Sequence, residues 1–522
     1  MERDWAPEDI DRIIEMAWED RTPFDAIEHQ WGLKENDVRA LMRKHMKRSS
    51  FEMWRKRVKG RKTKHAAPRT DGIDRFKSIR GTIGGAVSEN LTPLDVVKFT
   101  AAYATILKES FKNQAVHVVV GRDARISGPM VQSLVQATLV GMGVNVIDLD
   151  LSTTPTVAIS VPLKGAQGGI ILTASHNPKQ WNALKLLNEK GEFISAAVGQ
   201  RVLELAEEAA FEFAEVDHLG SQITDNSFLE KHIEAVLKLS LVNETVVRAA
   251  KFKVVVDGVN SSGGIYIPAL LEAMGVEVVK LFCEPTGHFP HNPEPLEAHL
   301  TDIKAAVLAH KADLGIVVDP DVDRLAFISE DGSMFGEEYT LVACADYVLS
   351  KTPGATVSNL SSTRALRDVT QKYGQKYTAS AVGEVNVVTA MKAGNAVIGG
   401  EGNGGIIYPE SHYGRDALVG VALFLMLLAE KKTTASALRA SYPAYFMRKD
   451  KISLTEDINV DGILASMAIL YQSEEVNTTD GVKIDFDSYW VHLRKSNTEP
   501  IIRIYTEATS LELATSVADA MM

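Results

Sequence analysis

The chain has 522 residues, of which 45% are hydrophobic and 24% charged, as is typical of a large soluble protein with several domains. The net charge of −12 argues against general nucleic-acid binding, and no apolar run approaches the roughly 20 residues of a membrane span. The amino terminus is charged and lacks the apolar segment of a secretory signal, and the two cysteines form no metal-binding pattern. These features predict a cytoplasmic protein with reduced thiols.

Residues 1–66 are expected to form a separate, all-α module. Amphipathic periods follow Pro7 and Thr22, and Asn36 is a candidate cap for a third helix. Between residues 41 and 69, twelve lysines and arginines stand against a single acid. Helices joined by a glycine-containing turn and followed by a basic segment favour a helix-turn-helix. Two interpretations stay open here: a small accessory bundle with a solvated basic tail, or a module that binds nucleic acid.

After a polar linker, apolar strands alternate with helical periods, which is the pattern of α/β layers. Three α/β domains of similar size are expected at 75–217, 218–333 and 334–444. Their predicted strands lie at 116–120, 144–149, 168–172, 253–256, 276–281, 314–318 and 396–398.

A polar turn follows the predicted strand at 168–172. It reads Thr-Ala-Ser-His-Asn-Pro and displays Ser175 beside His176, before an Asn-Pro turn signal. A hydroxyl displayed at a strand end can act as a nucleophile or carry a phosphoryl group. An isolated Ser-His pair is more often an ordinary turn, so this interpretation depends on a second motif.

That second motif is an acidic loop after the predicted strand at 314–318. It reads Asp-Pro-Asp-Val-Asp-Arg and contains Asp319, Asp321, Asp323 and Arg324. Carboxylates at alternate positions can converge on one hard cation, and such oxygen ligands suit Mg²⁺. The arginine adds a planar donor for phosphate. The alternatives are a solvated acidic turn and a calcium loop, although an EF-hand loop needs more ligands than this stretch offers.

Two further motifs carry groups that bind hydroxyls and phosphates. Residues 399–405 read Gly-Gly-Glu-Gly-Asn-Gly-Gly, in which Glu401 and Asn403 are suited to hydroxyl recognition, without the spacing of a nucleotide P-loop. Near the carboxyl end, a dense set of donors predicts a phosphate cradle, with a surface turn as the alternative. Its members are Arg494, Lys495, Ser496, Asn497, Thr498 and Arg503.

These four elements, in this order, resemble the α-D-phosphohexomutase superfamily, most of all bacterial phosphoglucosamine mutases and their phosphomannomutase-like relatives. The resemblance covers roughly residues 75–522 and includes 121–125, 182–185 and 287–295. It implies three α/β domains and a carboxy-terminal α+β domain at 445–522 around a central cleft, preceded by the all-α module. That module resembles a small bacterial family of uncharacterised function. The implied reaction moves a phosphoryl group between the 6- and 1-positions of a hexose phosphate.

The resemblance also implies roles for single residues. Ser175 would carry the phosphoryl group and, with Asp319, Asp321 and Asp323, would hold one Mg²⁺. His176 and Lys185 are candidates for proton transfer, since the family keeps a catalytic lysine ten residues after the serine. Glu401 and Asn403 would bind sugar hydroxyls, and a hexose 1,6-bisphosphate would be intermediate and activator. Phosphate would meet Arg80, Arg122, Arg125, Arg324, Arg494, Ser496, Asn497, Thr498 and Arg503.

The chain departs from the family pattern at several positions. The first loop, at 77–81, lacks a glycine before Arg80, and many relatives have serine at Asn403 and histidine at Gly405. The expected substrate is glucosamine phosphate, with mannose and glucose phosphates as alternatives, and no oligomeric state is predicted. An alternative of another class is a catalytically silent sugar-phosphate sensor whose basic module binds nucleic acid. Retention of Ser175 and of all three aspartates argues against it.

Overall fold

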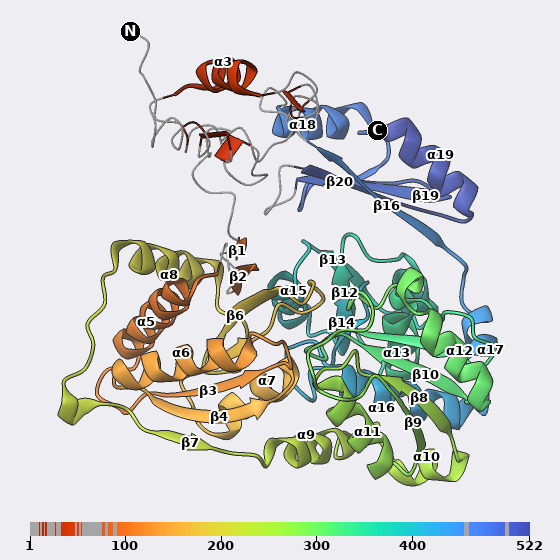
Figure 1. The fold of residues 1–522 in the computed structure, drawn as a ribbon. Helices are drawn as coiled ribbons and strands as arrows, with labels where there is room; N and C mark the ends of the chain where they lie inside the picture. Colours follow the sequence, from red (N-terminus) through yellow and green to blue (C-terminus); the bar gives the residue numbers. More distant parts are fainter. Residues whose placement is uncertain are drawn as a thin grey trace. The chain divides into compact units, whose positions relative to one another are not determined.

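The computed structural model divides the chain into two compact units, residues 1–73 and residues 74–522 (Figure 1). The residues that the structure describes are 10, 13–14, 16–17, 27, 33–46, 50–51, 54, 76–78, 82–86, 91–453, 459–495 and 501–522. Among them, no helix combines the length and apolar character needed to cross a bilayer.

The described part of the first unit is helical and has its own small core. Helix α3 (Glu35–His45) is capped at Lys34, two residues before the predicted cap, and the Lys34 amide donates to Asp37 Oδ2 at 3.1 Å. Eight buried side chains form the core: Ile13, Met16, Ala17, Ile27, Val38, Met42, Phe51 and Trp54. The predicted starts at Pro7 and Thr22 lie outside the described residues.

The first α/β domain has a seven-stranded sheet in the order β1-β2-β6-β5-β3-β4-β7. Its helices bury apolar side chains against both faces of the sheet. The strands are β1 (Phe76–Ser78), β2 (Thr82–Ala86), β3 (His117–Arg122), β4 (Asn145–Leu151), β5 (Gly168–Leu172), β6 (Trp181–Leu187) and β7 (Gln222–Thr224). The helices are α5 (Pro93–Ser110), α6 (Gly128–Gly141), α7 (Thr154–Leu163) and α8 (Ala196–Glu208).

The second α/β domain has a four-stranded sheet in the order β11-β10-β8-β9. Its strands are β8 (Lys253–Asp257), β9 (Glu277–Leu281), β10 (Leu314–Val318) and β11 (Leu325–Ser329), and its helices are α9 (Phe228–Leu237), α10 (Glu244–Ala250), α11 (Gly263–Ala273) and α12 (Thr301–His310). The acidic loop connects β10 to β11, which return antiparallel to each other.

The third α/β domain has a four-stranded sheet in the order β13-β12-β14-β15. Its strands are β12 (Thr356–Asn359), β13 (Tyr377–Ser380), β14 (Ile398–Glu401) and β15 (Gly405–Ile407). Its helices are α13 (Glu337–Lys351), α14 (Ala365–Lys372), α15 (Glu384–Gly394), α16 (Ala417–Lys431) and α17 (Ala435–Ala440). The glycine-rich loop connects β14 to β15.

The three sheets share one topology. In each, two strands pair in parallel with a central strand, and the third strand then pairs antiparallel with a fourth: β4-β3-β5-β6, β9-β8-β10-β11 and β13-β12-β14-β15. The serine, acidic and glycine-rich loops each join the third strand to the fourth. Three chemically different motifs therefore occupy equivalent positions of a repeated fold.

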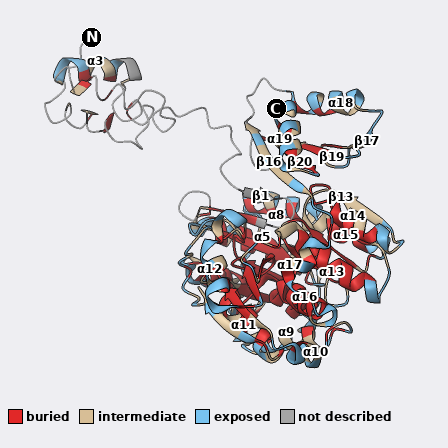
Figure 2. Cartoon of the chain, turned by 90° about the vertical axis from the view of Figure 1, so that its right-hand side faces the viewer, coloured by how far each residue is buried: buried red, intermediate tan, exposed pale blue. Residues whose placement is uncertain are grey.

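The second and third domains share a continuous apolar core, which Figure 2 shows as buried residues in the interior. Helix α16 is buried along almost all of its length, and its Phe424 stacks on Phe327 of β11 with ring centroids 3.8 Å apart. The predicted boundary near residue 333 therefore separates two sheets but not two cores.

The carboxy-terminal domain has an antiparallel sheet in the order β16-β20-β19-β18-β17, with two helices packed against it. Its polar face contacts the third domain, where Ser361 Oγ lies 2.9 Å from His492 Nδ1 and Arg364 Nη2 donates to Asp485 Oδ1 at 3.1 Å. The elements are β16 (Phe446–Ser453), β17 (Glu475–Asn477), β18 (Val482–Asp485), β19 (Tyr489–Lys495), β20 (Ile501–Ala508), α18 (Val460–Leu470) and α19 (Leu511–Met521).

Because the chain divides at residue 73, deletion of residues 1–66 should leave the remaining chain folded. Its unfolding temperature and its turnover of a hexose phosphate should stay close to those of the full chain, the turnover within a few-fold. Melting by circular dichroism and steady-state kinetics of the two chains, side by side, test this. A clear loss of turnover or of stability would show that the first unit supports the rest of the protein.

Candidate active site

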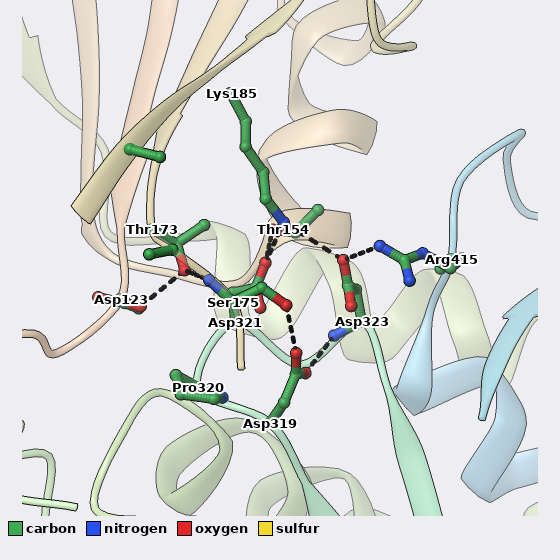
Figure 3. A network of polar contacts seen from close by, with 12 residues as sticks. Asp123, Thr154, Thr173, Ser175, Lys185, Asp319, Pro320, Asp321, Asp323 and Arg415 are labelled. Atoms are coloured by element: carbon green, nitrogen blue, oxygen red, sulfur yellow. Dashed lines mark hydrogen bonds and ion pairs between the residues drawn. The ribbon is translucent and has the colours of Figure 1, made fainter. Parts of the chain in front are cut away.

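Ser175 stands in the turn between β5 and β6 with a left-handed backbone, φ 49°. This conformation is costly for a residue with a β-carbon and is found most often at functional sites. The Ser175 amide donates to Thr173 Oγ1 at 2.9 Å, and the Ser175 hydroxyl donates to Asp319 Oδ2 at 2.7 Å (Figure 3). The turn thus presents its hydroxyl to the acidic loop of the second domain, as the sequence predicted.

A fully buried ion pair fixes the shape of this turn. Arg125 Nε donates to Asp123 Oδ2 at 3.0 Å, and Asp123 also accepts from Thr173 Oγ1 at 2.7 Å. The other donors of Arg125 reach the carbonyl oxygens of Ser175, Asn177, Pro178 and Trp181. Since all five guanidinium donors are then used by the protein, this geometry favours a supporting role for Arg125 over the direct phosphate contact that the resemblance implied.

The three aspartates of the acidic loop meet in one place. One carboxylate oxygen from each of Asp319, Asp321 and Asp323 lies within 4.8 Å of the other two, and all three residues are buried. Val322 adopts a left-handed backbone that tightens the loop, and Asp319 Oδ1 accepts the amide N–H groups of Asp323 and Arg324, each at 3.1 Å. The loop therefore converges its carboxylates as the spacing predicted.

Cations from two other domains approach these carboxylates. Lys185 Nζ of β6 lies 2.5 Å from Asp321 Oδ2 and 3.3 Å from Asp323 Oδ2, and Arg415 Nη2 donates to Asp323 Oδ2 at 2.7 Å (Figure 3). Thr154 Oγ1 also donates to Asp321 Oδ2. The second oxygens, Asp321 Oδ1 and Asp323 Oδ1, are buried with no hydrogen-bond partner among the described residues. Unpaired buried oxygens are costly, and they fit a bound cation such as Mg²⁺.

Burial and neighbouring charges shift the pKa values of this cluster. Burial, together with repulsion from Asp321 and Asp323, raises the pKa of Asp319 well above its usual range. Burial opposes ionisation of Asp321, yet the adjacent Lys185 lowers its pKa below the usual value. Conversely, burial opposes the charge of Lys185, but the two aspartates raise its pKa. Lys185 is therefore cationic at neutral pH in this arrangement.

His176 lies beside Ser175 and is neutral. Burial and repulsion from Arg324 lower the pKa of His176 well below its usual value, and its Nδ1 is buried without a hydrogen-bond partner among the described residues. Arg324 Nη1 donates to Glu294 Oε1 at 3.1 Å, and its Nε, 4.0 Å from Asp319 Oδ2, makes no hydrogen bond within the described chain. Both side chains thus keep a polar group available to a ligand.

Arg122 is not brought to this cluster. Its guanidinium donates to Gln132 Oε1 at 2.8 Å and to Asp150 Oδ1 at 2.7 Å, and the Asp150 side chain is half exposed. Arg80, Ser496, Asn497 and Thr498 lie outside the described residues. Arg494 and Arg503 lie opposite each other on the neighbouring strands β19 and β20.

The glycine-rich loop holds Glu401 in a fixed orientation. Glu401 Oε1 accepts from Asn359 Nδ2 at 2.9 Å and from the Gly383 amide at 3.1 Å. Gly404 has a φ of 83°, and a β-carbon there would lie 2.0 Å from the carbonyl oxygen of Leu325, so only glycine allows this approach to β11. The loop is thereby pressed against the strand that follows the acidic loop. Asn403 Oδ1 accepts from the amide of the loop's last glycine at 3.2 Å.

Sequence reasoning missed Arg415, which precedes α16 and joins the two loops. Its Nη1 lies 3.3 Å from Glu401 Oε2, and its Nε donates to Glu384 Oε2 at 2.8 Å, in addition to the contact with Asp323. No local motif marks this residue, because it follows a turn and precedes an ordinary apolar helix.

Family models match almost the whole chain. Residues 75–213, 230–332 and 336–445 match the phosphoglucomutase/phosphomannomutase alpha/beta/alpha domains I, II and III, and residues 448–522 match the C-terminal domain. Residues 11–80 match a protein of unknown function (DUF2805), as the resemblance of the first module indicated.

Curated relatives and a solved structure agree with these matches. The chain is 35% identical over 440 residues to a phosphoglucomutase/phosphomannomutase of Thermococcus kodakarensis, which covers 83% of this chain and 95% of that protein. It is 32% identical over 444 residues to a probable phosphoglucosamine mutase of Methanopyrus kandleri, covering 84% and 96% respectively. A crystal structure of a phosphoglucomutase/phosphomannomutase family protein from Burkholderia thailandensis superposes with a TM-score of 0.74 at 26% identity, covering 84% of this chain and 94% of that one. The chain therefore belongs to the phosphoglucomutase/phosphomannomutase family of the phosphohexomutase superfamily and is an isomerase that moves a phosphoryl group within a hexose phosphate.

Proposed function

We propose that this enzyme interconverts glucosamine 6-phosphate and glucosamine 1-phosphate through a phosphoryl group carried on Ser175. The observation that carries the proposal is the 2.7 Å hydrogen bond from Ser175 Oγ to Asp319 Oδ2, which joins a strained serine turn to a buried cluster of three aspartates. A hydroxyl held against metal-ligating carboxylates is placed to exchange a phosphoryl group whose charge a cation can neutralise.

The residues that would hold Mg²⁺ are Asp319, Asp321, Asp323 and Ser175. The bound ion would neutralise charge on the phosphoryl group during transfer. In the first step, a free hydroxyl of the hexose phosphate attacks the phosphorus atom, the bond from phosphorus to Ser175 Oγ breaks, and the hydroxyl loses its proton. His176, which follows the serine directly, is the candidate to accept that proton. Lys185, whose Nζ contacts Asp321 and Asp323 of the same cluster, is the candidate to supply one to the departing serine oxygen.

The second step returns a phosphoryl group to the enzyme. The hexose 1,6-bisphosphate turns over, and Ser175 Oγ attacks the phosphate at the other end of the sugar. Glu401 and Asn403 would bind sugar hydroxyls in both orientations, while Arg324 would contact the phosphate being transferred. The phosphate that is not transferred would meet the cradle of Arg494, Ser496, Asn497, Thr498 and Arg503. The bisphosphate would also activate enzyme whose serine is unphosphorylated.

The choice of sugar rests on the relatives. The Methanopyrus kandleri protein is named a probable phosphoglucosamine mutase, whereas the Thermococcus kodakarensis protein is named for glucose and mannose phosphates. These sugars differ at one ring carbon, so a few contacts decide between them. Cytoplasmic location and nucleic-acid binding by the first unit stay predictions from sequence.

Replacing the predicted carrier tests the mechanism most directly. Ser175→Ala should lose nearly all turnover while folding normally, since it removes the attacking oxygen and one hydrogen bond. Intact-mass and peptide analysis of the wild type should show a phosphoryl adduct on Ser175. Ser133→Ala is the matched control, because this exposed serine of α6 donates its hydroxyl to the Pro129 carbonyl of the same helix, and the turnover and adduct of this variant should not change. A fully active Ser175→Ala enzyme would refute the phosphoserine mechanism.

Metal dependence has a separate test. A chelator should abolish turnover and Mg²⁺ should restore it. Asp321→Asn should raise the Kd for Mg²⁺, measured by isothermal titration calorimetry, at least tenfold, because it removes one of three converging charges while keeping the side-chain shape. Asp331→Asn, in an exposed turn, is the control and should bind Mg²⁺ like the wild type. Tight Mg²⁺ binding and full activity in Asp321→Asn would be incompatible with the proposed site.

A comparison of substrates tests the sugar. We expect kcat/KM with Mg²⁺ to be highest for glucosamine phosphate when glucosamine, glucose and mannose phosphates are assayed side by side. A preference for glucose or mannose would leave the mutase mechanism intact and overturn the sugar assignment. Binding of all three without turnover would instead support the sugar-phosphate sensor.

A further inference from the structure

Arg415 contacts three carboxylates that come from three different elements. It reaches Asp323 of the acidic loop, Glu384 at the start of α15 and Glu401 of the glycine-rich loop, through Nη2, Nε and Nη1 respectively. Only 8% of the residue is exposed. The rigid guanidinium fork therefore spans the gap between the predicted metal ligands and the predicted sugar-binding carboxylate.

The side chain of Arg415 also fills the space above Gly405. A β-carbon at Gly405 would lie 2.3 Å from Arg415 Cδ and 2.9 Å from Arg415 Cγ, which is closer than atoms can approach. Any side chain at position 405 would therefore have to displace Arg415.

We propose that Arg415 is a positioning residue that couples sugar binding at Glu401 to cation binding at Asp323. The proposal rests on the proposed function. Arg415 and Lys185 hold Asp323 Oδ2, so that Asp323 Oδ1 stays unpartnered among the described residues and available to a cation. Arg415 also contacts Glu401 Oε2, while Asn359 and Gly383 hold the other oxygen of the same carboxylate.

The two binding events are coupled because the guanidinium group of Arg415 is rigid and contacts both Glu401 and Asp323. A sugar hydroxyl that binds Glu401 shifts the carboxylate that Arg415 contacts, and the planar guanidinium transmits the shift to Asp323. Because linkage is reciprocal, the sugar phosphate and the cation must then change each other's affinity by the same factor. A lysine cannot replace this connection, since one ammonium group has no fixed fork and cannot reach three separate carboxylates.

Binding of Mn²⁺, followed by electron paramagnetic resonance, measures this coupling without depending on turnover. In the wild type, saturating hexose 6-phosphate should change the Kd for Mn²⁺ at least fivefold. Arg415→Lys should abolish that change, lower kcat/KM at least tenfold, and raise both the KM for sugar phosphate and the activation constant for Mg²⁺. Arg439→Lys is the matched control, because Arg439 stacks on the Tyr339 ring and donates to the Phe335 carbonyl, and should keep the coupling.

The Gly405→Ala variant disturbs the contacts of Arg415 by steric displacement and leaves every charge in place. The added β-carbon must displace Arg415, so this variant should also lose the coupling, and it should have no further effect in an Arg415→Met background. Wild-type coupling that persists in both Arg415→Lys and Gly405→Ala would overturn the inference while leaving the mutase proposal intact. If the phosphoserine proposal itself is wrong, the Ser175→Ala variant will show this by retaining turnover, whereas the Mn²⁺ measurements do not test that proposal.

Discussion

The structure of residues 74–522 depends on the neutralisation of three buried carboxylates. The acidic loop of the second domain cannot balance Asp319, Asp321 and Asp323 with its own side chains, because it has one arginine, which pairs with Glu294 and approaches Asp319 Oδ2 at 4.0 Å. The cations in contact with Asp321 and Asp323 are Lys185 from the first domain and Arg415 from the third. Removing one partner of a buried ion pair typically costs about 3–5 kcal/mol. The same ion pairs that form the site therefore also join three domains around it.

The repeated topology explains why these groups meet. Each functional loop connects the third strand of a sheet to an antiparallel fourth strand, so each lies at the same edge of its own sheet. Three sheets that turn this edge toward one point bring together a hydroxyl, a set of metal ligands and a sugar-binding carboxylate. Strand order and loop position are maintained by the apolar pattern and by hydrogen-bond pairing, neither of which requires similar residues. The repeat is for this reason plain in the sheets and too weak to recognise in the sequence.

The parts of the site that sequence reasoning located are those with a local signal. Ser175 and the acidic loop follow apolar strands, and the contact between Ser175 and Asp319 confirms that they meet. Arg415 was missed because its partners are distant in sequence and its own surroundings look ordinary. Arg122 and Arg125 share one motif, yet only Arg125 faces the serine turn, since Arg122 is the last residue of β3 and Arg125 lies in the loop that follows the strand. The cap of α3 lies two residues before the predicted one, because the Asp37 side chain accepts the amide hydrogen bond of Lys34.

Charge balance then constrains what the site accepts. Asp319, Asp321, Asp323, Glu384 and Glu401 contact Lys185, Arg324 or Arg415, so the five carboxylates outnumber the three cations. The raised pKa of the buried Asp319, caused by burial and by its neighbouring aspartates, has the direction that such an excess produces. A dianionic phosphoryl group placed on Ser175 would add to the repulsion. A divalent cation offsets both the excess and the phosphoryl charge, which is why a metal ligand set, a phosphoryl carrier and a sugar-binding carboxylate are built here into one connected group.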